Sequence, residues 1–189
     1  GSNIVSTSQL YGGTYNMFAH TFPRQGIDVR FASHNDYEGL ESLIDENTRA
    51  GFCESIGNPA GNIVDLQKLA DIAHKHGVPL IVDNTVATPI LSRPIEHGAD
   101  IVVHSLTKYV GGHGTTLGGA IIDSGKFDWA ANKKRFPILN EPDPSYHGVV
   151  YTEALGEAAF IGRARVVPLR NTGGALAAQS AFQLMQGLE

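Results

Sequence analysis

The stretch that decides the fold reads Ile101-Val102-Val103-His104-Ser105-Leu106-Thr107-Lys108. It opens with three β-branched apolar residues, which is typical of a buried strand. Two hydroxyl residues and an amine follow, and a glycine-rich segment, residues 111–114, comes directly after them. Ligands of parallel sheets bind at the carboxyl ends of the strands. The stretch therefore predicts a buried strand that delivers Lys108 to a site, with an ordinary surface lysine as the alternative.

The same pattern of helix and strand extends to both sides of this stretch. Apolar residues at 66, 69, 70 and 73 have helical spacing, and Gly77 and Pro79 predict where that helix ends. The apolar run 80–82 then predicts a strand that ends at Asp83. Further elements are expected as strands at 49–54 and 118–122 and as a helix at 37–45. This alternation predicts an α/β fold, a three-layer α/β/α arrangement with helices on both faces of a mostly parallel sheet.

Length and composition limit the classes of protein to which the chain can belong. Its 189 residues, of which 42% are hydrophobic, suffice for one well-buried domain. A net charge of -5 argues against nucleic acid as a partner. No apolar run has the length of a membrane span, and the single cysteine, Cys53, cannot form an internal disulfide. We therefore expect a cytoplasmic protein, and the abrupt ends of the chain suggest a fragment of a longer one.

Lys108 and Asp83 are the candidates for chemistry. A lysine beside two hydroxyls suits a Schiff base with pyridoxal phosphate, with Ser105 and Thr107 donating to the phosphate. Asp83 lies 25 positions earlier, at the end of another predicted strand, so the two residues can face each other across a cofactor. A carboxylate there would pair with the pyridine nitrogen and keep the ring protonated. The alternative for Asp83 is a turn or helix-cap residue.

Four motifs in order along the chain carry a family resemblance: Leu10–Tyr15, Gly57–Pro59, Val82–Thr85 and His104–Tyr109. Together they resemble the fold type I pyridoxal-phosphate enzymes of cysteine and methionine metabolism. Two further segments, 111–116 and 140–148, are similar to the O-acetylhomoserine sulfhydrylase branch of that family. The resemblance covers nearly the whole chain. It implies that residues 1–189 form the large pyridoxal-phosphate-binding domain, without the family's N-terminal segment and C-terminal small domain.

The resemblance also implies a role for each matching residue. Tyr11 would stack on the cofactor ring, and Asn58 would hydrogen-bond the ring oxygen, although a core or turn role for Tyr11 stays open. Asp83 would pair with the ring nitrogen. The complete set expected to bind the cofactor is Tyr11, Asn58, Asp83, Thr85, Ser105, Thr107 and Lys108. Of these, Lys108 and Tyr11 are also expected to act in catalysis.

The activity implied by the resemblance is a γ-replacement. O-acetylhomoserine would react with sulfide or a small thiol to give homocysteine or methionine and acetate, and the full-length protein would be a homo-oligomer, a dimer of dimers. The alternatives are a cystathionine or methionine γ-lyase or a synthase of the same family, and an inactive cofactor-binding fragment. Nucleotide binding without chemistry is disfavoured because the glycines at 111–119 do not fit G-x-G-x-x-G. No metal is expected, since His74 and His76 point to different faces of a helix.

Overall fold

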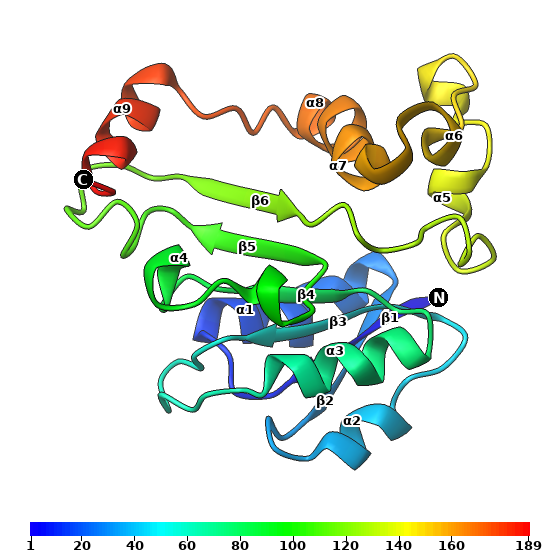
Figure 1. The fold of residues 1–189 in the computed structure, drawn as a ribbon, viewed down its shortest axis with the longest axis horizontal. Coiled ribbons are helices and arrows are strands. Elements are labelled where there is room, and N and C mark those ends of the chain that lie inside the picture. Colours follow the sequence, from blue (N-terminus) through cyan, green and yellow to red (C-terminus); the bar gives the residue numbers. More distant parts are fainter.

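The computed structural model describes residues 1–189, and its centre is one six-stranded sheet. The strands lie in the order β2-β1-β3-β4-β5-β6 (Figure 1). Their bounds are β1 Ser2–Thr7, β2 Ile27–Ala32, β3 Thr48–Glu54, β4 Leu80–Asp83, β5 Ile101–Ser105 and β6 Gly119–Asp123. Strands β1 to β5 pair in parallel, and β6 runs antiparallel to β5. The predicted α/β class with a mostly parallel sheet is confirmed.

Short helices connect the strands and form the outer layers. The α-helices are α1 Gly12–Asn16, α2 Tyr37–Ser42, α3 Leu66–Lys75, α4 Thr88–Leu91, α5 Pro137–Asn140, α6 Tyr151–Leu155, α7 Ala159–Ala164, α8 Arg170–Thr172 and α9 Ala178–Gln186. The 3₁₀ and π segments are η1 Met17–Thr21, η2 Phe22–Gln25, η3 Pro94–His97, η4 Pro144–Tyr146, η5 Gly156–Ala158 and η6 Arg165–Leu169. In Figure 1, α2 and α3 lie in front of the sheet and α1 lies behind it. None of the helices combines the length and the hydrophobicity that a membrane span requires.

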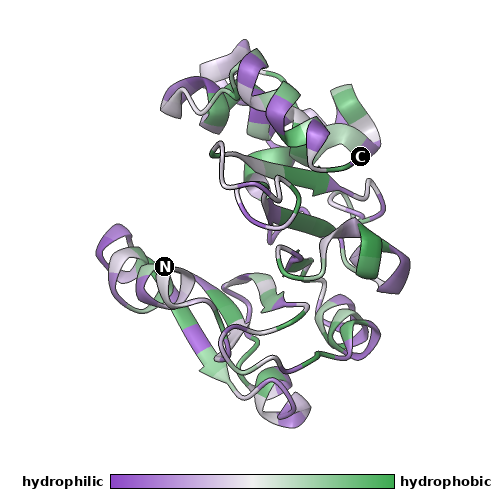
Figure 2. Cartoon of the chain, turned by 90° about the vertical axis from the view of Figure 1, so that its left-hand side faces the viewer, coloured by the Kyte–Doolittle hydropathy of each residue, from purple (hydrophilic) through white to green (hydrophobic).

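Each face of the sheet has its own hydrophobic core, because successive strand residues point to opposite faces. On one face, Leu80 and Val82 of β4 pack with Val102 of β5 against the apolar side of α3. On the other, Ile81 and Ile101 pack with Trp129, Phe136 and Tyr151, which belong to the part of the chain that follows β6 and form a C-terminal aromatic cluster. In Figure 2, hydrophobic residues predominate in the strands, between helices with hydrophilic outer turns. The expected helices on both faces are therefore present.

Strands β1 and β2 were not predicted from the sequence, because polar residues interrupt the apolar ones in both. Strand β1 buries polar residues, with Asn3, Ser6 and Thr7 each at most 2% exposed. Asn3 donates to Asp45 Oδ1 at 2.8 Å and accepts from Thr48 Oγ1 at 2.7 Å, so its amide is satisfied. These partners are more than forty positions away. Only the fold brings them together, and the sequence pattern therefore missed β1.

Candidate active site at the strand ends

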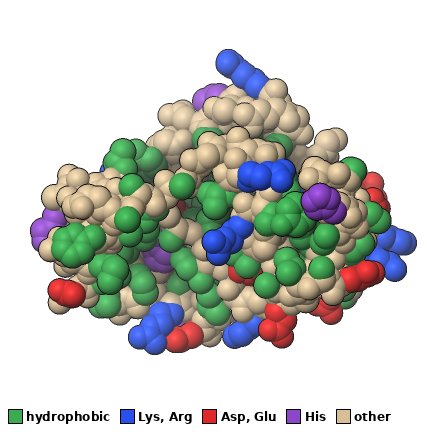
Figure 3. Space-filling model, turned by 90° about the horizontal axis from the view of Figure 1, so that it is seen from above, with side chains coloured by type: hydrophobic (Ala, Val, Ile, Leu, Met, Phe, Trp, Pro, Cys, Tyr) green, Lys and Arg blue, Asp and Glu red, His purple; other side chains and the backbone are tan.

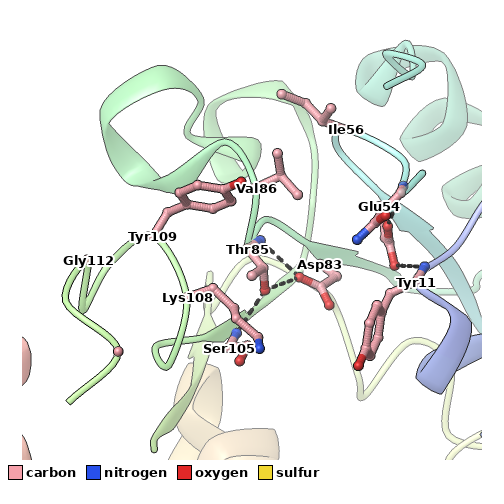
Figure 4. A pocket seen from close by; sticks show the side chains of 12 residues that line it. Tyr11, Glu54, Ile56, Asp83, Thr85, Val86, Ser105, Lys108, Tyr109 and Gly112 are labelled. Carbon is pink, nitrogen blue, oxygen red and sulfur yellow. Dashed lines mark hydrogen bonds between the residues drawn. The ribbon is translucent and has the colours of Figure 1, made fainter. Parts of the chain in front are cut away.

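The carboxyl ends of β3, β4 and β5 open into a pocket of about 460 Å³. This volume lies within the range of about 300–1,000 Å³ that is usual for small-molecule sites. The lining residues are Tyr11, Glu54, Ile56, Asn58, Asp83, Thr85, Val86, Ser105, Lys108, Tyr109, Gly112 and Gly114 (Figure 4). Strand ends that are far apart in the sequence thus meet at one edge of the sheet.

Asp83 is held at the end of β4 by Thr85. The Thr85 backbone N–H and hydroxyl both donate to Asp83 Oδ1, at 2.9 and 2.5 Å. The Thr85 hydroxyl oxygen also accepts the N–H of Ser105 at 2.8 Å, which connects the end of β4 to the end of β5. The bond to the backbone two residues on is an Asx turn, so the turn role of Asp83 is real. It uses Oδ1 alone and leaves Oδ2 available to a ligand.

Lys108 lies on the turn that follows β5. The Lys108 N–H donates to Ser105 O at 3.2 Å, and the N–H of Gly112 donates back to Lys108 O at 2.8 Å. Gly112 has φ 69°, a left-handed conformation that favours glycine. The Lys108 side chain is exposed to the pocket, and Figure 4 shows it beside Ser105 and near Asp83. The turn therefore delivers an amine to the same cavity as the carboxylate.

Tyr11 stands at the N-cap of α1, on the wall formed by the N-terminal part of the chain. Its side chain is 53% exposed, so Tyr11 is not a core residue. Gly13 is what allows the ring to lie where it does, because a Cβ on Gly13 would meet Tyr11 Cε1 at 2.6 Å. An aromatic face on the pocket wall suits stacking on a flat ring.

Glu54 is a pocket residue that sequence reasoning missed. It ends β3 and lies beside Asp83 in the register of β3 and β4. Burial raises the pKa of the Glu54 carboxyl, the N–H of Tyr11 opposes this shift, and the negative charge of Asp83 raises the pKa further. A signal was present in the sequence: Glu54 is a carboxylate at the end of a predicted strand, as Asp83 is.

Six of the seven predicted cofactor residues line the pocket: Tyr11, Asn58, Asp83, Thr85, Ser105 and Lys108. Thr107 does not. Its hydroxyl donates to Gly118 O at 3.2 Å and accepts the N–H of Gly118 at 3.0 Å. A hydroxyl has one proton, so Thr107 can donate to a phosphate only by giving up its bond to Gly118 O.

His74, His76 and Cys53 lie away from the pocket. His74 Nε2 is 2.7 Å from Asp100 Oδ2, and His76 Nε2 is 2.9 Å from Glu41 Oε1. Each of these two histidines thus has a carboxylate partner. Cys53 is fully buried in the core, and burial raises the pKa of its thiol.

The pocket fits the chemical groups of pyridoxal phosphate. Oδ2 of Asp83 is an acceptor suited to a protonated ring nitrogen, and Tyr11 offers a ring face. Lys108 supplies the amine, and Ser105 supplies a hydroxyl on the same wall. An amine and a carboxylate in one cavity, with an aromatic wall, suit proton transfer at a carbon atom held between them.

Comparisons with a family model and with individual relatives agree on one protein family. A family model described as Cys/Met metabolism PLP-dependent enzyme matches residues 1–189. The homocysteine synthase of Schizosaccharomyces pombe is 56% identical over 190 residues, covering 100% of this chain and 44% of the relative. The O-acetyl-L-homoserine sulfhydrylase 1 of Thermus thermophilus is 53% identical over 191 residues, covering 100% and 45%.

A solved structure is similar in fold as well as in sequence. A Campylobacter jejuni protein described as an O-acetylhomoserine (thiol)-lyase superposes with a TM-score of 0.91 at 43% identity. The match covers 100% of this chain and 46% of that one, and that structure contains N'-pyridoxyl-lysine-5'-monophosphate. The chain spans less than half the length of each of these three relatives.

Proposed function

The chain belongs to the Cys/Met metabolism PLP-dependent enzyme family, and we propose that it is the cofactor-binding large domain of a longer O-acetylhomoserine sulfhydrylase. The reaction is O-acetylhomoserine plus hydrogen sulfide giving homocysteine plus acetate. The observation that carries the proposal is that Lys108 and Asp83 line one pocket at the sheet edge. The names of the relatives support the choice of substrate.

Bound pyridoxal phosphate withdraws electrons from the α carbon of an amino acid and so makes its proton acidic. In this proposal, Asp83 Oδ2 accepts a hydrogen bond from the protonated ring nitrogen, while Thr85 holds Oδ1. Tyr11 covers one face of the ring and excludes water from it, and Asn58 donates to the ring oxygen. Ser105 would donate to the phosphate, and Thr107 would do so only by giving up its hydrogen bond to Gly118 O.

Lys108 is proposed to hold the cofactor before the substrate arrives and to move protons afterwards. Its amine takes the proton from the α carbon, and a proton lost from the β carbon allows acetate to leave from the γ carbon. Sulfide then adds at the γ carbon, and protons returned to the β and α carbons complete homocysteine. The turn after β5 positions the amine for these transfers.

Borohydride reduction tests the assignment of Lys108. Reducing the cofactor-loaded full-length protein and mapping its peptides should locate the pyridoxyl group on Lys108. The Lys108→Ala variant should carry no label, while Lys133→Ala, which changes an exposed lysine outside the pocket, should be labelled as the wild type is. A label on another lysine would overturn the assignment.

Product analysis tests the reaction. The full-length protein given O-acetylhomoserine and sulfide should release homocysteine and acetate in equal amounts, and omission of sulfide should stop homocysteine formation. Faster turnover of cystathionine or methionine under matched conditions would favour a γ-lyase instead.

We further propose a homo-oligomer, a dimer of dimers in the full-length protein, located in the cytoplasm, with amino acid and thiol as its small-molecule partners. The exposed apolar side chains of β6 and α9, such as Ile121 and Phe182, support an assembly. The single cysteine supports a reducing compartment. Light scattering on the full-length protein measures the mass of the assembly, and a monomeric mass would overturn this part of the proposal.

A further inference from the structure

Glu54 joins two segments of the pocket wall through its carboxylate. It ends β3, is 4% exposed, and lies on the face of the sheet edge that opens into the pocket. The backbone N–H of Tyr11 donates to Oε1 at 2.6 Å, and the backbone N–H of Asn58 donates to Oε2 at 3.2 Å. Tyr11 is 43 positions away and Asn58 only four, so one side chain fixes a distant segment and a local loop together.

We propose that Glu54 is a positioning residue, which holds the backbone at Tyr11 and Asn58 so that their side chains meet the cofactor in one fixed geometry. The proposal rests on the proposed function only in giving these two side chains a ligand. Glu54 acts through its neighbours. Its two oxygens each take a backbone donor, as Figure 4 shows for Tyr11.

The electrostatic setting argues that Glu54 is not there for stability. A buried carboxylate is costly unless it is hydrogen-bonded. Here burial and the neighbouring Asp83 raise the pKa of Glu54 although two backbone N–H groups oppose the shift, so ionising this carboxyl costs more than ionising an exposed glutamate. Lys108 is the cationic side chain among the residues that line the pocket. A neutral residue of the same shape would avoid this cost but could not accept both N–H groups.

Glu54→Gln is the informative substitution because it preserves the volume of the side chain. Its amide has one oxygen, which can accept one of the two N–H groups, and its NH₂ then faces the other donor. Asp100→Asn is the matched control. Asp100 is also a buried carboxylate that accepts a backbone N–H, from Leu80 at 2.8 Å, but it lies at the opposite end of the sheet.

Hydrogen exchange of the full-length protein without cofactor tests the contacts directly. In E54Q, the amide of Tyr11 or Asn58 should exchange about tenfold faster than in the wild type, the factor that a loss of about 1.4 kcal/mol produces. D100N should leave both amides unchanged. Unchanged exchange at Tyr11 and Asn58 in E54Q overturns the proposal. If E54Q does not fold, as unprotected amides in α3 would reveal, the same measurement is made on Glu54→Asp, whose shorter side chain cannot reach both donors.

Cofactor affinity tests the consequence. E54Q should bind pyridoxal phosphate about tenfold more weakly, and D100N should bind it as the wild type does. In a Tyr11→Ala/Asn58→Ala background, E54Q should cause no further loss, since the residues through which it acts are gone. An equal further loss would mean that Glu54 acts directly and would overturn a positioning role. If the wild type binds no cofactor, the proposed function fails, while the exchange experiment still decides the contacts of Glu54.

Discussion

At the scale of single residues, the pocket depends on shared hydrogen bonds. Thr85 is the clearest case, because its one hydroxyl donates to Asp83 and accepts from the backbone of Ser105. It therefore orients the carboxylate and ties two strand ends together. The Asx turn alone would orient Asp83 only relative to its own segment. The hydrogen bond to Ser105 also fixes the position of this segment relative to the turn that carries Lys108.

Thr85→Val should weaken cofactor binding about tenfold, as expected for the loss of roughly 1.4 kcal/mol. Valine has the shape of threonine without its hydroxyl, so Asp83 loses one donor and the Ser105 N–H loses its acceptor. An absorbance titration of the full-length protein with pyridoxal phosphate measures the change. Thr85→Ser keeps the hydroxyl and should behave as the wild type; equal affinities of the valine and wild-type proteins would contradict this role.

At the scale of the elements, the composition of α1 affects the pocket, whereas the composition of α3 affects the stability of the fold. Helix α1 begins with two glycines, which is unfavourable for a helix. Gly12 has open space where a Cβ would lie, whereas a Cβ on Gly13 would meet the ring of Tyr11. The Tyr11 ring is therefore a steric reason for glycine at position 13, and no such reason exists at position 12.

Gly13→Ala should displace the Tyr11 ring and weaken cofactor binding, while leaving the free energy of unfolding equal or higher by up to about 1 kcal/mol. Alanine favours the helix, and the exposed ring can move aside at little cost. Gly12→Ala is the matched control and should have the same effect on stability without an effect on affinity. Thermal unfolding and cofactor titration measure the two quantities, and the prediction is wrong if both variants lose affinity alike.

Helix α3 is held to the start of β5 by His74 and Asp100, and this contact should depend on pH. The hydrogen bond to Asp100 raises the pKa of His74 above its ordinary value of 6.5, against the effect of burial. Because folding raises the pKa of His74, its charged form stabilises the fold fully below pH 6.5. This contribution disappears as the pH rises through the pKa of His74 in the folded state.

His74→Asn should therefore cost stability at pH 5.5 to 6 and cost less as the pH rises above 6.5 toward 9, as measured by denaturant unfolding at each pH. A constant difference between the wild type and the His74 variant across this range would contradict a charged pair.

At the scale of the whole molecule, one sheet supports two cores. Alternate residues of β4 and β5 enter opposite clusters, so neither core can be lost without disturbing the other face. The face over β6 and α9 is different, because many hydrophobic side chains there remain exposed (Figure 3). An apolar surface of this kind is typical of an interface with another protein segment.

The two cores should unfold together. Trp129 is the one tryptophan and is 5% exposed within the C-terminal aromatic cluster, so its fluorescence reports on one core. Far-ultraviolet circular dichroism reports on the helices and strands of both. Denaturant titrations of the 189-residue chain followed by the two signals should have the same midpoint. An earlier fluorescence transition would show that the C-terminal helices separate from the sheet first.

The sequence by itself determined the parts of the fold and site that are local. The apolar runs before Asp83 and Ser105 predicted β4 and β5, and the helix at α3 followed from its spacing. The end of a strand and the residues after it are neighbours in the chain. Residues 83–85 and residues 105–108 therefore remain close neighbours in the structure. Six of the seven predicted residues line one pocket.

Only the tertiary structure decided which distant groups share a hydrogen bond. The Glu54 carboxylate accepts the N–H of Tyr11, which is 43 positions away in the sequence. Thr107 is hydrogen-bonded to Gly118 and does not line the pocket. The buried amide of Asn3 in β1 finds its partners in residues far along the chain, and the antiparallel direction of β6 is likewise a property of the assembled sheet. Buried polar groups need partners, and the sequence names the groups while the fold alone sets which of them come within bonding distance.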